Sequence, residues 1–278
     1  MPGQASVWGA NGGRHECRPY GFWSYCSDRR VLAWVSTGVG WRMDLAAAKA
    51  LVTGGGTGIG KATAKALVGR GARVVIAGRR GDVLRKTAQE IGAIPVTADV
   101  TSEADVTRLV ATVIRELGDY NVLVNNAGAG VFAPLLSVTA ADMRRIWEIN
   151  VLGATLVARE SARHFVARRT GAIVNVSSTS SQRPGPGSSA YASSKFALSG
   201  LTEVWRSELR KENIRVMQVN PSEVLTPFGE AAGRPPRTSD SPRKLHAEDI
   251  GQVIAGLLAL DDRVLVTSTT IWATNPES

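Results

Sequence analysis

Short apolar runs alternate with longer segments of helical pattern from residue 48 onward, and this alternation is the feature that most limits how the chain can fold. The runs are apolar nearly throughout, not at every second residue, which indicates strands that are buried on both faces. Strands of this kind form a parallel sheet that helices cover on both sides. We therefore expect an α/β protein with a doubly wound, mostly parallel sheet.

The predicted strands cover residues 49–55, 72–78, 94–100, 120–128, 171–178, 215–221 and 269–275. The predicted helices cover residues 60–71, 81–92, 102–118, 139–169, 190–214 and 247–260. Ser102, followed by an acidic first turn, is an N-cap signature for the third of these helices. A doubly wound sheet binds its ligand beyond the carboxyl ends of its strands, so we expect a site in the segments that follow the strands.

Composition excludes several other classes of protein. With 278 residues, 44% hydrophobic and 21% charged, the chain suits a globular domain with a small appendage. No window approaches the ~20 apolar residues of a membrane span, and no Cys/His cluster has metal-ligand spacing. The net charge of +9 comes from scattered arginines without interleaved aromatics, so we expect solvated faces and no nucleic-acid partner. A few of these arginines can still serve an anionic substrate or cofactor.

Residues 1–42 differ from the rest, since they hold both cysteines, four of the seven tryptophans and no regular period. Our preferred interpretation is an N-terminal extension, disordered or translated upstream of a working start at Met43, before a domain over residues 43–278. A targeting segment is the alternative, because Arg29-Arg30 precedes an apolar stretch, although that stretch is short and interrupted. The body has no disulfide framework, so we expect a cytoplasmic protein.

A glycine-rich stretch, TGGGTGIG at Thr53–Gly60, lies between the first predicted strand and the first helix. In this context Gly54 allows a tight turn, Gly58 lets the backbone approach a pyrophosphate, and Gly60 allows close packing of the helix. The amino end of the helix then faces the anion. A flexible strand-to-helix turn is the alternative for this stretch taken alone.

Tyr191 and Lys195 lie four residues apart in a predicted helix, on the same face. A phenol with a pKa of about 10 is a poor base at neutral pH, and a neighbouring ammonium favours the phenolate. Taken alone, such a pair is most often two ordinary helix neighbours.

Three motifs occur together in one order: TGxxxGxG, NNAG at residues 125–128, and YxxxK at residues 191–195. The chain therefore resembles the short-chain dehydrogenase/reductase family in its single-domain branch, and is similar to its 3-oxoacyl-acyl-carrier-protein reductases. The resemblance covers residues 48–275 and no part of the leader. It implies a single-domain Rossmann fold and hydride transfer between a nicotinamide dinucleotide and a carbonyl or secondary alcohol.

The resemblance also implies the residues that bind the cofactor. The family places an acid and the residue after it beside the adenine, and it lines the cofactor with NNAG and with the segment after the sixth strand. With the glycine-rich turn, these positions are Gly54, Thr57, Gly58, Ile59, Gly60, Asp99, Val100, Asn126, Ala127, Gly128, Tyr191, Lys195, Pro221, Val224 and Thr226. Asn125 is expected to stabilise the sheet. Asp99 can also belong to a helix cap, and NNAG can be a structural turn.

The end of the second predicted strand bears on the choice between NAD and NADP. Gly78 stands where relatives that prefer NAD carry a carboxylate, and Arg79 follows it. A guanidinium can pair with a ribose 2′-phosphate through two charge-assisted hydrogen bonds. We therefore expect NADP(H) to be favoured over NAD(H), with Arg80 assisting. The alternative is that both arginines lie at a solvated turn.

The family mechanism implies four catalytic residues. Tyr191 exchanges a proton with the substrate oxygen, and Lys195 supports it and holds the ribose hydroxyls. The family serine lies thirteen residues before the tyrosine, which selects Ser178 over Ser177, and its hydroxyl stabilises the developing negative charge. Asn150 matches the asparagine that holds a water leading from the lysine to solvent, and a helix-interior asparagine at a kink is its structural alternative.

One departure from the family pattern concerns the pocket. Ser222 replaces the usual glycine after Pro221, so we expect the backbone there to avoid positive φ, while Glu223 brings a charge near the nicotinamide end. The residues expected to line the substrate pocket are Phe132, Gln182, Arg183 and a polar lid over residues 226–249.

We expect an NADP(H)-dependent oxidoreductase that works in the reductive direction on a 3-oxoacyl thioester or a small ketone or aldehyde, without a metal. A non-catalytic dinucleotide-binding regulator on the same fold is the alternative, which an intact catalytic quartet disfavours. The helices around residues 141–168 and 190–212 resemble those that pair in family dimers and tetramers, so we expect a homodimer or homotetramer.

Overall fold

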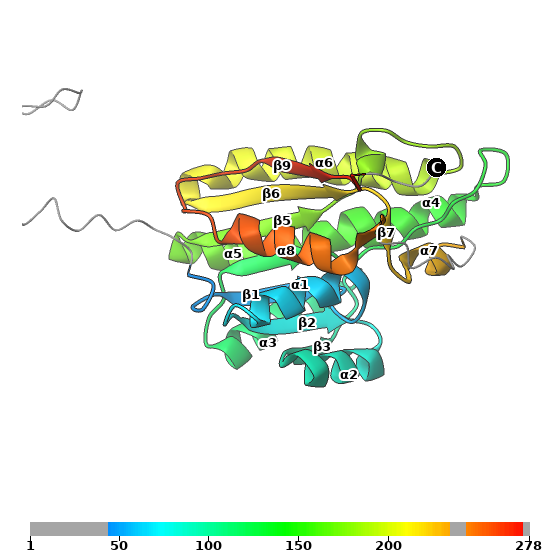
Figure 1. Cartoon of the computed structure of the whole chain (residues 1–278). Coiled ribbons are helices and arrows are strands. Elements are labelled where there is room, and N and C mark those ends of the chain that lie inside the picture. Colours follow the sequence, from blue (N-terminus) through cyan, green and yellow to red (C-terminus); the bar gives the residue numbers. More distant parts are fainter. Residues whose placement is uncertain (1–43, 234–242, 275–278) are drawn as a thin grey trace, which may run out of the picture. The chain divides into compact units, whose positions relative to one another are not determined.

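A computed structural model describes residues 44–233 and 243–274 (Figure 1). The predicted extension over residues 1–42 and part of the predicted lid, residues 234–242, lie outside the described residues. The main sheet contains β1 (Lys49–Thr53), β2 (Arg73–Gly78), β3 (Ile94–Thr97), β4 (Val122–Asn125), β5 (Gly171–Val176), β6 (Ile214–Pro221) and β9 (Ser268–Ile271). These strands follow the order β3-β2-β1-β4-β5-β6-β9. All of their pairings are parallel, so the predicted parallel sheet is confirmed.

Helices cover both faces of this sheet, as the apolar strands predict. They are α1 (Gly58–Val68), α2 (Gly81–Ile91), α3 (Glu103–Leu117), α4 (Ala140–Trp147), α5 (Ala154–Arg168), α6 (Ser189–Leu209) and α8 (Ala247–Leu258). Figure 1 shows α1 and α8 together on one face of the sheet. Successive strand residues serve opposite faces: Val52 joins a core with α1 and α8, whereas Leu51 joins a core with α3 and α5. The described body is therefore a doubly wound Rossmann fold.

The long helix predicted over residues 139–169 contains a π-helical turn, η1 (Glu148–Gly153), between α4 and α5. Side chains satisfy carbonyls around this turn: Thr155 Oγ1 donates to the Val151 oxygen at 2.7 Å, and Asn125 Nδ2 donates to the Ala154 oxygen at 2.8 Å. Asn125 thus ties the end of β4 to the helix, as a sheet-stabilising residue should. Insertions of this kind occur often at functional sites, and this one holds Asn150.

The predicted cap of α3 is confirmed, because the Ser102 side chain accepts a hydrogen bond from the Asp105 backbone nitrogen. After β6 the chain forms a small pair of strands, β7 (Val224–Leu225) and β8 (Leu245–His246), with a short helix α7 (Phe228–Ala231) between them. Of these short elements, α7 and β8 lie in the predicted lid, and β7 directly precedes it. They lie just past the carboxyl end of β6, next to the expected site.

None of the helices within residues 44–233 and 243–274 is long and apolar enough to cross a lipid bilayer. Within the same residues, no group of three or more His, Cys, Asp or Glu side chains is arranged to hold a metal ion.

Candidate active site

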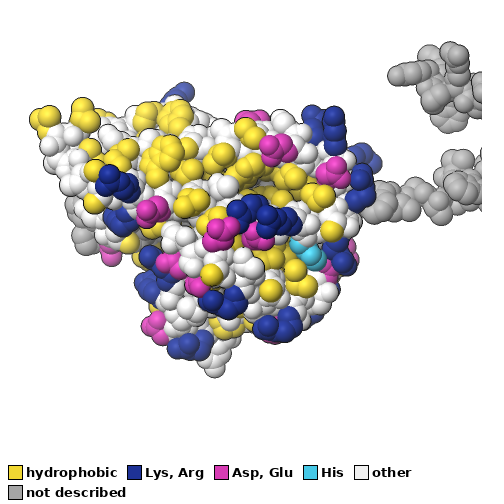
Figure 2. Space-filling view, turned by 180° about the vertical axis from the view of Figure 1, so that it is seen from behind, with side chains coloured by type: hydrophobic (Ala, Val, Ile, Leu, Met, Phe, Trp, Pro, Cys, Tyr) yellow, Lys and Arg dark blue, Asp and Glu magenta, His cyan; other side chains and the backbone are white. Residues whose placement is uncertain are grey.

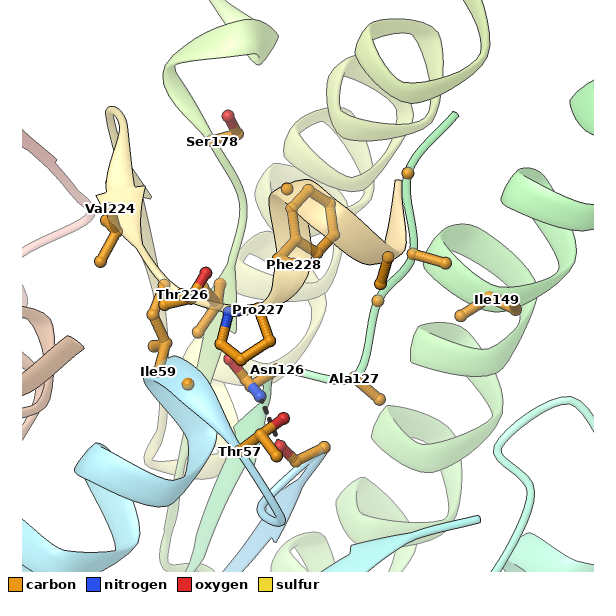
Figure 3. A pocket seen from close by; sticks show the side chains of 18 of the residues that line it. Thr57, Ile59, Asn126, Ala127, Ile149, Ser178, Val224, Thr226, Pro227 and Phe228 are labelled. Atoms are coloured by element: carbon orange, nitrogen blue, oxygen red, sulfur yellow. Dashed lines mark hydrogen bonds between the residues drawn. The ribbon is translucent and has the colours of Figure 1, made fainter. Parts of the chain in front are cut away.

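A cavity of about 1160 Å³ lies at the carboxyl ends of the strands. Segments that follow β1, β2, β3, β4, β5 and β6 form its wall. Figure 3 shows the turn at Thr57, the segment with Asn126 and Ala127, and the segment from Val224 to Phe228 meeting around it. The topology explains this position, since β1 pairs with β2 on one side and β4 on the other, which leaves a crevice at this edge.

The glycine-rich turn is built around close backbone approaches. Gly54 has φ of +63° and Gly58 has φ of +53°, both in the left-handed region that favours glycine. A Cβ on Gly60 would meet the Gly54 carbonyl oxygen and would lie 2.5 Å from Asn126 Nδ2. The Asn126 amide in turn donates to the Thr53 oxygen at 2.9 Å. Gly60 therefore lies behind the cavity and lets α1 pack against the turn.

The amino end of α1 is available to an anion. Its N-cap residue, Thr57, makes no side-chain capping hydrogen bond, and the first turn carries no acid. Thr57, Gly58 and Ile59 all line the cavity. Backbone N–H groups at a helix start, together with the positive end of the helix dipole, are suited to a pyrophosphate. On this evidence the residues present fit the phosphates of a dinucleotide.

Arg79 and Arg80 are exposed and line the cavity at the carboxyl end of β2. Neither arginine has a carboxylate partner among the described residues. Asp99 also lines the cavity, and its Oδ1 accepts hydrogen bonds from the nitrogen and hydroxyl of Thr101, at 2.9 and 2.8 Å. The second carboxylate oxygen of Asp99 makes no hydrogen bond within the described part of the chain. Asp99 thus shapes the local turn and keeps one acceptor, so its two predicted roles are compatible.

Lys195 lies buried beside Tyr191 on α6. Its Nζ donates to the Val176 oxygen at 2.9 Å and is 5.8 Å from the centre of the Tyr191 ring. Burial lowers the pKa of Lys195 to about 8. Because α6 presents both side chains toward one cavity, the pair predicted from its spacing is not a solvated pair on a helix surface.

Two aromatic rings flank the phenol of Tyr191. The ring centres of Phe132 and Phe228 each lie 5.5 Å from that of Tyr191. A Cβ on Gly130 would lie 2.9 Å from Phe228 Cζ and 3.3 Å from Phe132 Cε2. The absence of a side chain at Gly130 therefore lets α7 bring Phe228 against the site.

Ser177 and Ser178 differ in what their hydroxyls contact. Ser177 Oγ lies 3.4 Å from the Lys195 oxygen and 3.3 Å from Ser199 Oγ, inside the protein. Ser178 Oγ accepts a hydrogen bond from the Ser180 nitrogen at 3.1 Å. Both serines line the cavity, and Figure 3 shows Ser178. Accepting that bond leaves the Ser178 proton available, which suits a donor to a substrate oxygen.

Asn150 does not line the cavity but holds the segment that does. Its Oδ1 accepts from the Ala129 nitrogen at 2.8 Å, and its Nδ2 donates to the Ala129 oxygen at 2.9 Å and to Ser194 Oγ at 3.0 Å. A Cβ on Gly128 would lie 3.2 Å from Asn150 Oδ1 and 3.8 Å from Lys195 Nζ. The side chain of Asn150 thus links η1, α6 and the segment after β4.

All three predicted positions in the last cofactor segment, Pro221, Val224 and Thr226, line the cavity, and so do Ser222 and Glu223. Ser222 avoids positive φ as expected, since the described non-glycine residues with positive φ are Arg169 and Asn213. The Ser222 nitrogen donates to the Ile271 oxygen at 2.8 Å.

The predicted substrate wall is wrong at two positions. Gln182 and Arg183 do not line the cavity. Gln182 instead hydrogen-bonds Thr270 of β9 at 3.1 Å, because its loop turns toward the edge of the sheet. Sequence reasoning also missed Trp272, which lines the cavity directly after β9. The rule that sites follow the carboxyl ends of parallel strands was a signal for Trp272.

Comparison with known proteins agrees with this geometry. Residues 48–236 match the family model described as short chain dehydrogenase. An uncharacterized oxidoreductase of Bacillus subtilis, YxnA, is 37% identical over 190 residues, which are 66% of this chain and 53% of that protein. The chain thus spans about half the length of that relative. Human L-xylulose reductase is 38% identical over 231 residues, 81% of this chain and 93% of the reductase.

Among solved structures, the 3-ketoacyl-(acyl-carrier-protein) reductase of Brucella melitensis, complexed with NADH, superposes with a TM-score of 0.73. The two chains are 29% identical, and the match covers 80% of this chain and 95% of the reductase. The residues that match the family model contain β1 to β7 and α1 to α7. The chain belongs to the short-chain dehydrogenase family.

Proposed function

We propose that this protein is an NADP(H)-dependent oxidoreductase that reduces a carbonyl group to an alcohol, a secondary alcohol where the substrate is a ketone. The observation that supports this most is the arrangement around one cavity of Ser178, Tyr191 and Lys195 with the glycine-rich turn and Arg79. The residues that would bind a dinucleotide, the glycine-rich turn and Arg79, therefore line the same cavity as the residues that would exchange a proton with a carbonyl oxygen. A non-catalytic binding protein needs only the dinucleotide-binding residues.

A bound nicotinamide dinucleotide supplies the hydride. In this proposal the Ser178 hydroxyl donates a hydrogen bond to the carbonyl oxygen and holds the charge that develops there. Tyr191 then transfers its proton to that oxygen, and the Lys195 ammonium stabilises the resulting phenolate. Asn150 keeps the segment after β4 in place through its contacts with Ala129.

The preference for NADP(H) rests on Arg79 and Arg80. A phosphate on the ribose would reach cations at the carboxyl end of β2, where Gly78 provides no opposing carboxylate. The Brucella reductase is complexed with NADH, so membership of the family does not by itself choose between the two cofactors. Reduction is the proposed direction because cellular NADPH favours it.

The substrate is proposed to be a 3-oxoacyl thioester or a small ketone or aldehyde. Two relatives are named for substrates of these kinds: the human relative for L-xylulose, a small ketone, and the Brucella relative for 3-ketoacyl groups on acyl carrier protein. The walls around Tyr191 are the rings of Phe132 and Phe228, which favour an apolar substituent on the carbonyl carbon.

The experiment is a screen of carbonyl compounds with wild-type protein and with Tyr191→Phe. Oxidation of NADPH is measured as the decrease in the absorbance of NADPH. We expect wild type to oxidise NADPH with at least one compound, and Tyr191→Phe to bind NADPH without turnover. If both proteins bind NADPH and neither oxidises it with any compound, the regulator on the same fold is the correct interpretation.

A homodimer or homotetramer is also proposed. Trp147, Leu152, Phe196 and Val204 are 41–50% exposed on α4, η1 and α6, which pack against one another. Figure 2 shows hydrophobic side chains gathered over the upper part of the face opposite α1 and α8. Pairing of this face between copies would bury them. Sedimentation of wild type and Phe196→Glu tests the proposal, and it fails if wild type is monomeric.

A cytoplasmic location stays a prediction.

A further inference from the structure

A row of polar side chains crosses four neighbouring strands in register. Asn125 on β4 pairs with Asn175 on β5, Asn175 with Gln218 on β6, and Gln218 with Ser268 on β9. The three amide residues are 3%, 0% and 6% exposed. Residues in register on parallel strands point to the same face of the sheet. Because buried amides are costly unless they are hydrogen-bonded, their partners on that face matter.

The side-chain amides of this row donate hydrogen bonds to the helices that cover this face. Asn125 Nδ2 donates to the Ala154 oxygen at the start of α5. Asn175 Nδ2 donates to Thr202 Oγ1 on α6 at 2.9 Å, and Gln218 Nε2 donates to Ser199 Oγ on α6 at 2.9 Å. Two side chains of the row therefore set the position of α6, the helix that carries Tyr191 and Lys195.

The two contacts with α6 have the same construction. Thr202 Oγ1 donates to the Leu198 oxygen at 2.7 Å, and Ser199 Oγ donates to the Lys195 oxygen at 3.0 Å. In each case an amide on a strand donates to a helix hydroxyl, which donates to the carbonyl four residues earlier. They differ in where they end, since the Gln218 contact ends on the main chain of Lys195, and Gln218 Nε2 donates in addition to Asn220 Oδ1 at 2.6 Å.

Lys195 is thereby held at both ends against the same short segment. Its carbonyl oxygen accepts a hydrogen bond from the Ser199 hydroxyl, and the Ser177 hydroxyl lies 3.3 Å from Ser199 Oγ. Its Nζ donates to the oxygen of Val176, the residue before Ser177. Ser178 comes next in the chain. A shift of α6 along β5 would therefore change the spacing between Lys195 and Ser178.

We propose that Gln218 is a positioning residue, which acts through Ser199 to fix Lys195 relative to Ser178. The single proton of the Ser199 hydroxyl is used on the Lys195 oxygen, so its lone pairs need an outside donor, and the Gln218 amide supplies it. Without that donor the part-buried hydroxyl loses one of its hydrogen bonds and is free to rotate away from Lys195. This inference rests on the proposed function for its kinetic consequence.

The test compares Gln218→Met with Thr202→Val. Methionine has a length similar to glutamine and no donor, whereas Thr202→Val removes the matched contact that ends on Leu198. Misplacement of a catalytic group by a fraction of an ångström lowers turnover, so we expect Gln218→Met to reduce kcat about tenfold with KM values within about twofold of wild type. We expect Thr202→Val to lower the Tm by about as much as Gln218→Met does, because each variant loses one hydrogen bond to α6. Its kcat is expected to stay within about twofold of the wild-type kcat.

Ser199→Ala supplies a second route to the same contact. We expect it to lower kcat to about the same extent as Gln218→Met, and the double variant to lose no more than the worse single variant, because both changes break one chain of hydrogen bonds. The inference is overturned if Gln218→Met keeps the wild-type kcat, if Thr202→Val loses as much, or if the two losses multiply.

A crystal structure of each variant gives a readout that needs no substrate. The distance from Lys195 Nζ to the Val176 oxygen, 2.9 Å in wild type, is expected to lengthen in Gln218→Met and to stay the same in Thr202→Val. An unchanged distance in both contradicts the positioning role. If wild type turns over no carbonyl compound, the proposed function fails, and this structural comparison still decides whether Gln218 positions Lys195.

Discussion

Replacing Lys195 with methionine is expected to make the ligand-free protein more stable at neutral pH. Burial lowers the pKa of the wild-type ammonium from the ordinary lysine value of 10.5 to about 8. This difference costs the folded state about 3 kcal/mol at pH 7, where the lysine is charged in both states. Loss of the hydrogen bond from Nζ to the Val176 oxygen offsets about 1 kcal/mol. The net gain is about 2 kcal/mol, or about 5 °C in Tm.

The sign of the pH dependence follows from the direction of the shift. Between about pH 8 and pH 10.5 the unfolded chain holds a proton on Lys195 that the folded protein has released. The stability of wild type relative to the variant therefore rises with pH across this window. Above it the folded state no longer carries the desolvation cost, and the advantage of Lys195→Met disappears.

The assay is thermal unfolding of ligand-free wild type, Lys195→Met and Lys211→Met from pH 7 to pH 10.5. Lys211 is exposed, so its replacement controls for the loss of one positive charge. Groups that titrate in both proteins cancel in the difference. The reasoning is refuted if Lys195→Met is no more stable than wild type at pH 7, or if its advantage is the same at every pH.

Three further changes test the cavity. Arg79→Ala is expected to raise the Kd for NADPH by about ten- to a hundredfold through loss of a charge-assisted pair while leaving the Kd for NADH unchanged, as followed by cofactor fluorescence; equal effects on both would remove Arg79 from the 2′-phosphate site. Gly60→Ala is expected to abolish dinucleotide binding in the same assay, because its Cβ would meet the Gly54 carbonyl oxygen. Gly200→Ala is the control, since a Cβ on Gly200 has no atom within 4 Å, and we expect it to bind the dinucleotide as wild type does. Phe228→Ala is expected to raise the KM of the carbonyl substrate about tenfold, since a buried aromatic contact with it is lost; a KM equal to that of wild type would show that Phe228 does not contact the substrate.

The fold was predictable from sequence because most strands, β1, β2, β4, β5 and β6, carry their own evidence of burial, whereas β3 and β9 are partly exposed. Leu51 and Val52 are both apolar, and they pack on opposite faces of the sheet. The glycine-rich turn was predictable for a similar reason, since the backbone conformation of Gly54 and the close packing at Gly60 depend on residue type. These features are local, so the sequence pattern contains them.

Features that depend on distant contacts were not predictable. The π-helical turn around Asn150 depends on the Asn125 amide that captures the Ala154 oxygen. Gln182 was predicted to line the substrate pocket, yet the loop takes it to Thr270. Ser199 also looked like an ordinary polar residue on a helix. Only the register of β5 and β6 shows that it meets Gln218.

The central claim is that Tyr191 gives its proton to a carbonyl oxygen while hydride reaches the carbon from the cofactor. The most direct test uses NADPH deuterated at the reactive C4 position, with mass spectrometry of the alcohol formed by wild type and by Tyr191→Phe. We expect one deuterium on the alcohol carbon with wild type and no product with Tyr191→Phe at equal cofactor occupancy. An alcohol formed without deuterium, or one formed equally well by Tyr191→Phe, would contradict it.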